Sequence, residues 1–185
     1  KVSRSWPSTA FRNRPRFATA AANGSITNVG STDNTFAYTL TAVTNPVNYT
    51  INVTKGKLTV TASDALTVSA ADVTKKYDGN AYGVSASASV PSTQIRYSLT
   101  NSTNPADYTL TTSPTATHVG DSKTVYFVAT NPNYVPAFGE ADVTITPRTI
   151  TLTAATQSRP YNGNALTDAN VIISGDDFIG TDGYA

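Results

Sequence analysis

The chain of 185 residues contains no cysteine and no methionine, and it has only one histidine and one tryptophan. Without cysteine, neither disulfide bonds nor thiolate metal sites can form. Only 14 % of the residues are charged, and no apolar run reaches the roughly 18 residues that a membrane-spanning helix requires. These absences exclude a disulfide scaffold and a helical membrane span within this sequence. The lack of cysteine also fits a secreted protein.

Thr, Ser, Asn, Val and Tyr are abundant instead, and this composition favours strands and polar turns. From Thr35 onward large apolar residues alternate with polar ones, as at Phe36, Tyr38 and Leu40, a pattern typical of strands. No segment combines helical spacing of apolar residues with helix caps. The sequence therefore predicts an all-β fold. The same alternation predicts strands near residues 57–61, 66–68, 95–99, 125–129, 143–145, 150–152 and 171–173.

Two short sequences each occur twice. The letters YDGNA at residues 77–81 recur as YNGNA at 161–165, a step of 161 − 77 = 84, and TNVG at 27–30 recurs as THVG at 117–120, a step of 117 − 27 = 90. A period of this size corresponds to one small β domain, so we predict a tandem array of Ig-like or β-grasp-like modules. The repeat residues that we predict to form structural turns are Tyr77, Asp78, Gly79, Tyr161, Asn162, Gly163, Gly30 and Gly120.

Turn chemistry separates the predicted strands. Asp and Asn tolerate a positive φ and Gly has no Cβ, so the Asp-Gly and Asn-Gly pairs of the two repeats indicate tight turns. Three Asn-Pro turns elsewhere are each followed closely by a tyrosine, whose ring can pack under the loop with its hydroxyl outward or toward backbone. These tyrosines are Tyr49, Tyr108 and Tyr134.

The repeats also divide the chain. Residues 64–147 make one complete module, whereas residues 24–63 match the second half of a module and residues 148–185 the first half. About 40 residues bury too little surface to fold alone, and each half is expected to leave open strand edges. Two interpretations stay open. The chain is a piece of a longer array, or the halves of neighbouring chains complete each other by head-to-tail strand addition and build an open filament.

Residues 1–23 differ in composition from the rest and form a basic arm. Five positive charges and no acid occur within the first 17 residues. Such an arm can bind nucleic acid or an anionic surface. It also fits a disordered leader or a segment removed by processing. We favour the second interpretation and predict no nucleic-acid partner. The five basic residues are Lys1, Arg4, Arg12, Arg14 and Arg16.

Residues suited to catalysis are few. His118 occupies a turn position where the other repeat has Asn28, so we predict a structural role for it rather than catalysis or zinc binding. Composition does not exclude a Ser-His-Asp triad, but no nucleophile-elbow motif accompanies His118. Glu140 is the only glutamate, which leaves a glycosidase carboxylate pair without support. We therefore predict no enzyme activity, no cofactor and no metal.

Two other groups of side chains could carry chemistry. Loop carboxylates could bind Ca²⁺, but no EF-hand pattern is present and solvated turn acids are favoured; these acids are Asp33, Asp176, Asp177 and Asp182. A Lys–Asn isopeptide bond, as some surface domains form, would need a buried acid beside the lysine. The candidate lysines, all in polar contexts, are Lys57, Lys75, Lys76 and Lys123.

The sequence VTKKYDGNAY at residues 73–82, followed by VG at 119–120, NY at 133–134 and VTIT at 143–146, resembles the MBG and YDG domains. These domains occur as tandem arrays in large bacterial surface and adhesin-like proteins. The flanking repeats extend the resemblance over residues 24–185, although Asn162 stands where the family prefers Asp and the basic arm matches nothing. The resemblance implies surface display and, for some members, binding of mucin or another host ligand. It implies no catalytic residues.

These observations predict a non-catalytic extracellular structural repeat of a bacterial surface adhesin or stalk. One alternative is a subunit of a self-assembling filament, whose partners are identical subunits joined head to tail by strand complementation. Another is a carbohydrate- or mucin-binding module. The expected partners are neighbouring repeats or identical subunits, with a host glycan or mucin as a further candidate.

Overall fold

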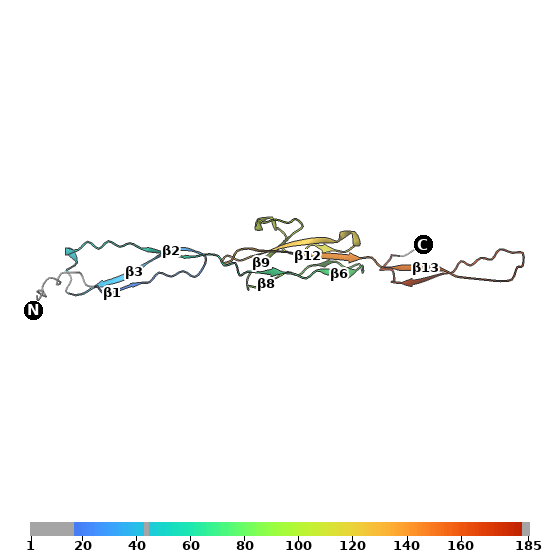
Figure 1. The fold of residues 1–185 in the computed structure, drawn as a ribbon, viewed down its shortest axis with the longest axis horizontal. Helices are drawn as coiled ribbons and strands as arrows, with labels where there is room; N and C mark the ends of the chain where they lie inside the picture. Colours follow the sequence, from blue (N-terminus) through green and yellow to red (C-terminus); the bar gives the residue numbers. More distant parts are fainter. Residues whose placement is uncertain (1–16, 43–44, 183–185) are drawn as a thin grey trace, which may run out of the picture. The chain divides into compact units, whose positions relative to one another are not determined.

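The computed structural model describes residues 17–42 and 45–182, and the chain divides into two compact units, Lys1–Ala62 and Ser63–Ala185. All regular elements in the described residues are β-strands or short 3-10 turns (Figure 1). The predicted all-β fold is confirmed. Each unit is described below by itself.

The first unit consists of two ribbons of two antiparallel strands. β1 pairs with β3, and β2 pairs with β4. Thr35 lies between β2 and β3, and its carbonyl accepts hydrogen bonds from the amides of Asn23 (2.8 Å) and Gly24 (3.2 Å). None of the described side chains of this unit is buried, so the ribbons have no core of their own. The elements are β1 (Phe17–Ala22), β2 (Gly30–Asn34), β3 (Phe36–Leu40), η1 (Pro46–Asn48) and β4 (Gly56–Val60).

β1 lies inside the segment 1–23 that the sequence predicts to be a disordered or processed arm. For residues 17–22 the prediction of disorder is wrong, because these residues pair along β3. The strand was missed because its sequence, FATAAA, lacks the alternation of large apolar and polar residues on which the strand predictions depend. Backbone hydrogen bonding does not require that alternation. Residues 1–16, with all five basic residues of the arm, lie outside the described residues.

The second unit contains a four-stranded sheet in the order β6-β12-β11-β9. β12 runs parallel to β6 and antiparallel to β11, and β11 runs antiparallel to β9. Two short antiparallel pairs, β5 with β8 and β7 with β10, accompany this sheet. The elements are β5 (Val68–Ser69), β6 (Val73–Lys76), β7 (Tyr82–Gly83), β8 (Ser87–Ala88), β9 (Gln94–Ser98), η2 (Pro105–Asp107), β10 (Thr115–Ala116), η3 (Val119–Asp121), β11 (Lys123–Thr130) and β12 (Ala137–Thr146).

The core lies between the four-stranded sheet and the short pairs. Phe127 of β11 is 1 % exposed, and its ring meets the edge of Tyr97 with 6.3 Å between ring centroids. Gly139 of β12 stands opposite Phe127, and a Cβ at this position would overlap the Phe127 ring. From the other layer, Val84 and Ala116 join the same cluster. The remaining buried members of the cluster are Val125, Ala141, Val143 and Ile145.

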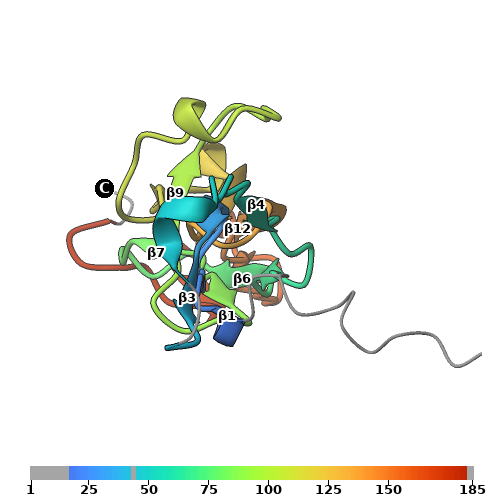
Figure 2. The same ribbon diagram turned by 90° about the vertical axis from the view of Figure 1, so that its left-hand side faces the viewer.

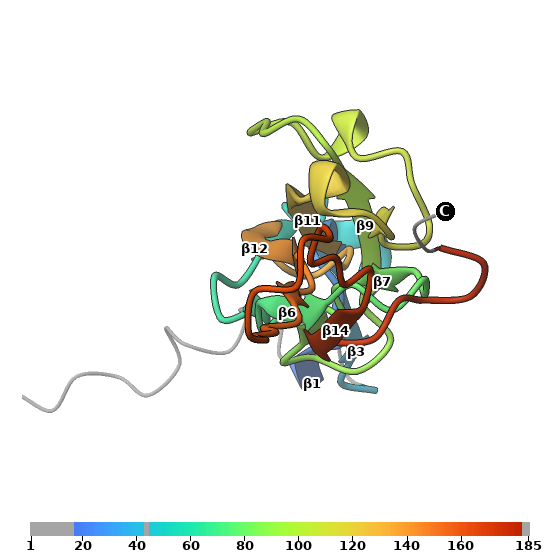
Figure 3. The same cartoon turned by 90° about the vertical axis from the view of Figure 1, so that its right-hand side faces the viewer.

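The outer face of the sheet is covered by the loop that follows β9 and carries η2. Figures 2 and 3, taken from opposite sides, place this loop (yellow-green) across β9 and β12 from β7. Tyr108 fixes the loop: it is 2 % exposed and its hydroxyl donates to the carbonyl of Ser102 at 2.9 Å. The Tyr108 ring also packs on Phe138, with 5.7 Å between centroids. The role predicted for a tyrosine after an Asn-Pro turn is confirmed at Tyr108.

A separate hairpin follows the four-stranded module. β13 (Ile150–Ala154) pairs antiparallel with β14 (Val171–Gly175), and their connection extends past both strands (Figure 1). Gly175 has a φ of +95°, and its backbone lies so close to the carbonyl of Thr149 that a Cβ would overlap it. Every residue of β14 is exposed.

Candidate inter-module joint

The two repeated turns have the same local geometry. The Asp78 side chain accepts a hydrogen bond from the amide of Asn80 at 2.9 Å, and Asn162 accepts from the amide of Asn164 at 3.2 Å. The glycines between them, Gly79 and Gly163, have φ angles of +80° and +79°. Both segments thus share the same side-chain-to-amide bond and the same positive glycine φ, and Asp and Asn exchange because either side chain supplies the accepting oxygen.

Tyr82 strengthens the first of these turns. Its hydroxyl donates to the second carboxylate oxygen of Asp78 at 2.5 Å. This bond, with the amide of Asn80, lowers the pKa of Asp78, and the Asp78 carboxylate raises the pKa of Tyr82. The other repeat has Leu166 at the matching position, so its turn lacks this bond.

The other repeated pair, Gly30 and Gly120, does not share one geometry. Gly30 begins β2 with a φ of +148°. Gly120 lies within η3, its φ is not positive, and a Cβ there would meet open space. Gly30 and Gly120 match in sequence, but only Gly30 has a positive φ that favours glycine.

His118 is the N-cap residue of η3. Its Nδ1 lies 3.2 Å from a carboxylate oxygen of Asp121, which also accepts from the amides of His118 and Thr117. Those bonds, the His118 amide first, lower the pKa of Asp121. The His118 ring stacks on the ring of Tyr77, with 5.7 Å between centroids. The turn at residues 118–121 thus packs against the repeat signature, the sequence YDGNA at residues 77–81.

The signature also meets the hairpin that follows the module. The ammonium group of Lys76, the last residue of β6, lies 2.9 and 3.0 Å from the two carboxylate oxygens of Asp176. Asp176 also accepts from the amide of Thr149 at 2.8 Å, and its own amide donates to the carbonyl of Thr149 at 2.7 Å. The bond from Lys76, followed by that from the Thr149 amide, lowers the pKa of Asp176.

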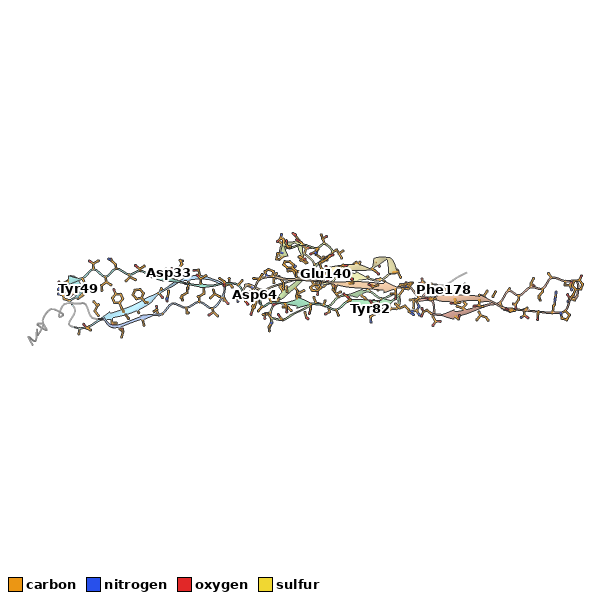
Figure 4. The ribbon with its side chains drawn as sticks, viewed as in Figure 1. Asp33, Tyr49, Asp64, Tyr82, Glu140 and Phe178 are labelled. Carbon is orange, nitrogen blue, oxygen red and sulfur yellow. The ribbon has the colours of Figure 1, made fainter. Side chains whose placement is uncertain are left out.

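Tyr77 forms the second half of this joint. Its amide donates to the carbonyl of Thr146 at 2.9 Å, and its carbonyl accepts from the guanidinium of Arg148 at 3.2 Å. Its hydroxyl lies 3.5 Å from a carboxylate oxygen of Asp182, beyond β14. The Nε of Arg148 is buried with no hydrogen-bond partner. Figure 4 shows Tyr82 on the module and Phe178 on the hairpin at this end of the module.

Several of the other candidate residues have non-covalent partners. Asp33 lies 3.8 Å from the ammonium group of Lys55 and 3.9 Å from that of Lys57. Lys123 donates to the carbonyl of Thr115 at 2.9 Å, and the ammonium of Lys75 lies 5.6 Å from the centre of the Tyr82 ring. In the part of the chain that the structure describes, no three acidic or histidine side chains are placed to hold a metal ion.

The described chain is all-β, and the first copy of the repeated turn, together with Lys76, contacts the hairpin that follows the module. Comparisons with protein-family models, with curated proteins and with solved structures find no match. Among residues 17–42 and 45–182, no helix has the length and apolar character needed to cross a membrane.

The two signature glycines give a direct test of the turn. Gly79→Ala is expected to destabilise the 64–147 module by about 1–2 kcal/mol, because an L-residue is strained at the positive φ of this position. Gly163→Ala has the same φ but no neighbour within 4 Å and lies in an exposed loop, so the module should unfold as before. Urea denaturation followed by circular dichroism measures both. Equal effects of the two substitutions would contradict this account.

Proposed function

We propose that the chain is a non-catalytic structural repeat of a bacterial surface adhesin or stalk, located outside the cell, whose task is to hold successive β modules in a fixed orientation. The observation that carries this proposal is the joint between the 64–147 module and the β13–β14 hairpin. A repeat that only tethered its neighbours would need no such network.

The linker at this joint has little freedom to swivel. β12 ends at Thr146 and β13 begins at Ile150, so only Pro147, Arg148 and Thr149 separate them. Proline has a fixed φ, Arg148 is bonded to the carbonyl of Tyr77, and Thr149 is bonded twice to Asp176. Pro147 is thus restrained by its ring, Arg148 by a partner on the module and Thr149 by a partner on the hairpin.

We expect the module and the hairpin to tumble as one body, and to separate when Asp176 loses its charge. The folded-state pKa of Asp176 is lowered, so its stabilising effect is complete above the ordinary value of about 3.9 and is lost as the pH falls through the lowered value. ¹⁵N relaxation of the full chain should therefore give β12 and β14 the same rotational correlation time at neutral pH. In strong acid, and in Asp176→Asn at neutral pH, β14 should become more mobile.

The matched control is Asp177→Asn, which removes the neighbouring exposed carboxylate and should leave the relaxation unchanged. Independent motion of the hairpin in the unsubstituted chain at neutral pH would overturn the proposed spacer function. Binding of a host glycan or mucin, which the family resemblance implies for some members, stays a prediction.

A further inference from the structure

The second copy of the repeated turn contains an Asn-Gly pair that is exposed to water. Asn162, Gly163 and Asn164 are all exposed, and they lie in the long connection between β13 and β14 (Figure 1). A Cβ built on Gly163 would meet no atom within 4 Å. The amide of Gly163 has no hydrogen-bond partner in the part of the chain that the structure describes. The backbone nitrogen of Gly163 and the side-chain amide of Asn162 are therefore both accessible for reaction.

This pair has the groups that a cyclisation needs. In an Asn-Gly sequence the glycine nitrogen can attack Cγ of the asparagine, and glycine hinders the approach least because it has no Cβ. The attack puts negative charge on the side-chain oxygen. In Asn162 this oxygen, Oδ1, already accepts a hydrogen bond from the amide of Asn164 at 3.2 Å. A donor aimed at an oxygen that becomes negative stabilises the transition state, so the turn favours the reaction as well as exposing it.

We propose that Asn162 is a site of spontaneous deamidation. The Gly163 nitrogen loses its proton to hydroxide and bonds to Cγ of Asn162. The Cγ–Nδ2 bond breaks, and the side-chain nitrogen takes a proton from water and leaves as ammonia, which produces a cyclic imide. Water then adds to either carbonyl carbon of the imide and opens the ring, which gives aspartate or isoaspartate. Nothing is oxidised or reduced, and water is the only co-reactant.

The two products differ in their effect on the turn. Aspartate is the residue type of the first copy, and it keeps an oxygen that accepts from the amide of Asn164, as Asp78 accepts from Asn80. Isoaspartate adds one carbon to the main chain and lengthens the turn. Either product adds a negative charge to an exposed loop. The inference goes beyond the proposed spacer function and does not depend on it, because Asn162 and Gly163 lie outside the linker at residues 147–149.

The first copy of the turn should resist the equivalent reaction. Cyclisation at Asp78 would need the protonated acid, because an ionised carboxylate is a poor electrophile. The hydroxyl of Tyr82, followed by the amide of Asn80, lowers the pKa of Asp78, so this carboxylate stays ionised. We therefore expect isoaspartate to accumulate at position 162 and not at position 78.

A second Asn-Gly pair, at residues 23–24, provides a matched control because the structure opposes the same reaction there. The amide of Gly24 donates to the carbonyl of Thr35 at 3.2 Å, and the side-chain oxygen of Asn23 accepts from the hydroxyl of Thr35 at 2.9 Å. A Cβ on Gly24 would lie 2.7 Å from Cα of Asn34, so the two backbone segments are closely packed. Asn23 can therefore react only after this region opens.

Incubation of the full chain at mildly alkaline pH, followed by peptide mapping with mass spectrometry, measures both sites in one sample. In the folded chain Asn162 should be converted at least about tenfold faster than Asn23. In guanidinium chloride at a concentration that unfolds the chain, the two rates should become similar, because both sites are then Asn-Gly pairs in an open chain. Electron-transfer fragmentation should find both aspartate and isoaspartate at position 162.

The variant Gly163→Ala tests the mechanism, because its Cβ hinders the attacking nitrogen. It should slow the conversion of Asn162 by about tenfold or more and leave Asn23 unchanged. An unchanged rate at Asn162 in this variant would refute attack by the backbone nitrogen. Equal rates at the two sites in the folded chain would overturn the proposal. Slower conversion of Asn162 in the folded chain than in guanidinium chloride would also overturn it, because the turn would then protect this residue.

Discussion

Phe127→Ala is expected to remove about 3–5 kcal/mol from the stability of the 64–147 module, the largest loss from any single truncation considered for this chain. The ring is 1 % exposed and contacts Tyr97. It also fills the space that Gly139 leaves on the neighbouring strand. On β12, Gly139 has no side chain that could move into the cavity. Since domains of this size are stable by only about 5–15 kcal/mol, the variant should be partly unfolded at moderate temperature.

Urea denaturation monitored by circular dichroism measures this loss, and Phe138→Ala is the matched control. Phe138 belongs to β12 as Gly139 does, but its side chain is on the outer face and 40 % exposed. Its truncation removes less buried area and should cost less than about 2 kcal/mol. If the two alanine variants unfold at the same urea concentration, the core does not lie on the face assigned to it.

Tyr108→Ala should be the second most damaging change, with a loss of about 3–5 kcal/mol because a 2 % exposed aromatic ring is removed. Tyr108→Phe keeps the ring and removes only the hydroxyl. That hydroxyl donates to the carbonyl of Ser102 at 2.9 Å and accepts from the amide of Ser102 at 3.4 Å. The phenylalanine variant should therefore lose about 1–2 kcal/mol. It should also release the Ser102 amide to faster hydrogen exchange.

Tyr161→Phe provides the comparison for the hydroxyl, because Tyr161 is 97 % exposed. Its free energy of unfolding should change by less than about 0.5 kcal/mol in the monomeric chain. An effect of Tyr108→Phe that is no larger than this would mean that the loop is held by the ring alone.

The strands with large alternating side chains could be predicted from the sequence, and those without them could not. Phe36, Tyr38 and Leu40 identify β3, whereas β1, with its run of small residues, carries no such signal. Among the four two-residue strands, β7, β8 and β10 are too short for any period to appear. Their pairing depends on tertiary packing against the four-stranded sheet, which exists only in the folded module.

At the candidate joint, local chemistry could be predicted and distant contacts could not. Asp78 and Asn162 indicate their turns because the accepting oxygen and the amide are two residues apart. Lys76 and Asp176 are 100 residues apart, and neither lies in a sequence motif that predicts contact with the other. The sequence places Asp176 among loop acids that could hold Ca²⁺, whereas its neighbour in the structure is the ammonium group of Lys76.

The parallel pairing of β6 with β12 also decides how the module responds to tension. The chain enters this pair at Val73 and leaves it at Thr146, at opposite ends of two strands that point the same way. A pull on the two ends of the module therefore slides the strands along each other. All of their backbone hydrogen bonds are then strained together, whereas an antiparallel pair pulled from one end opens one bond at a time. A module built in this way resists stretching along the direction of these two strands.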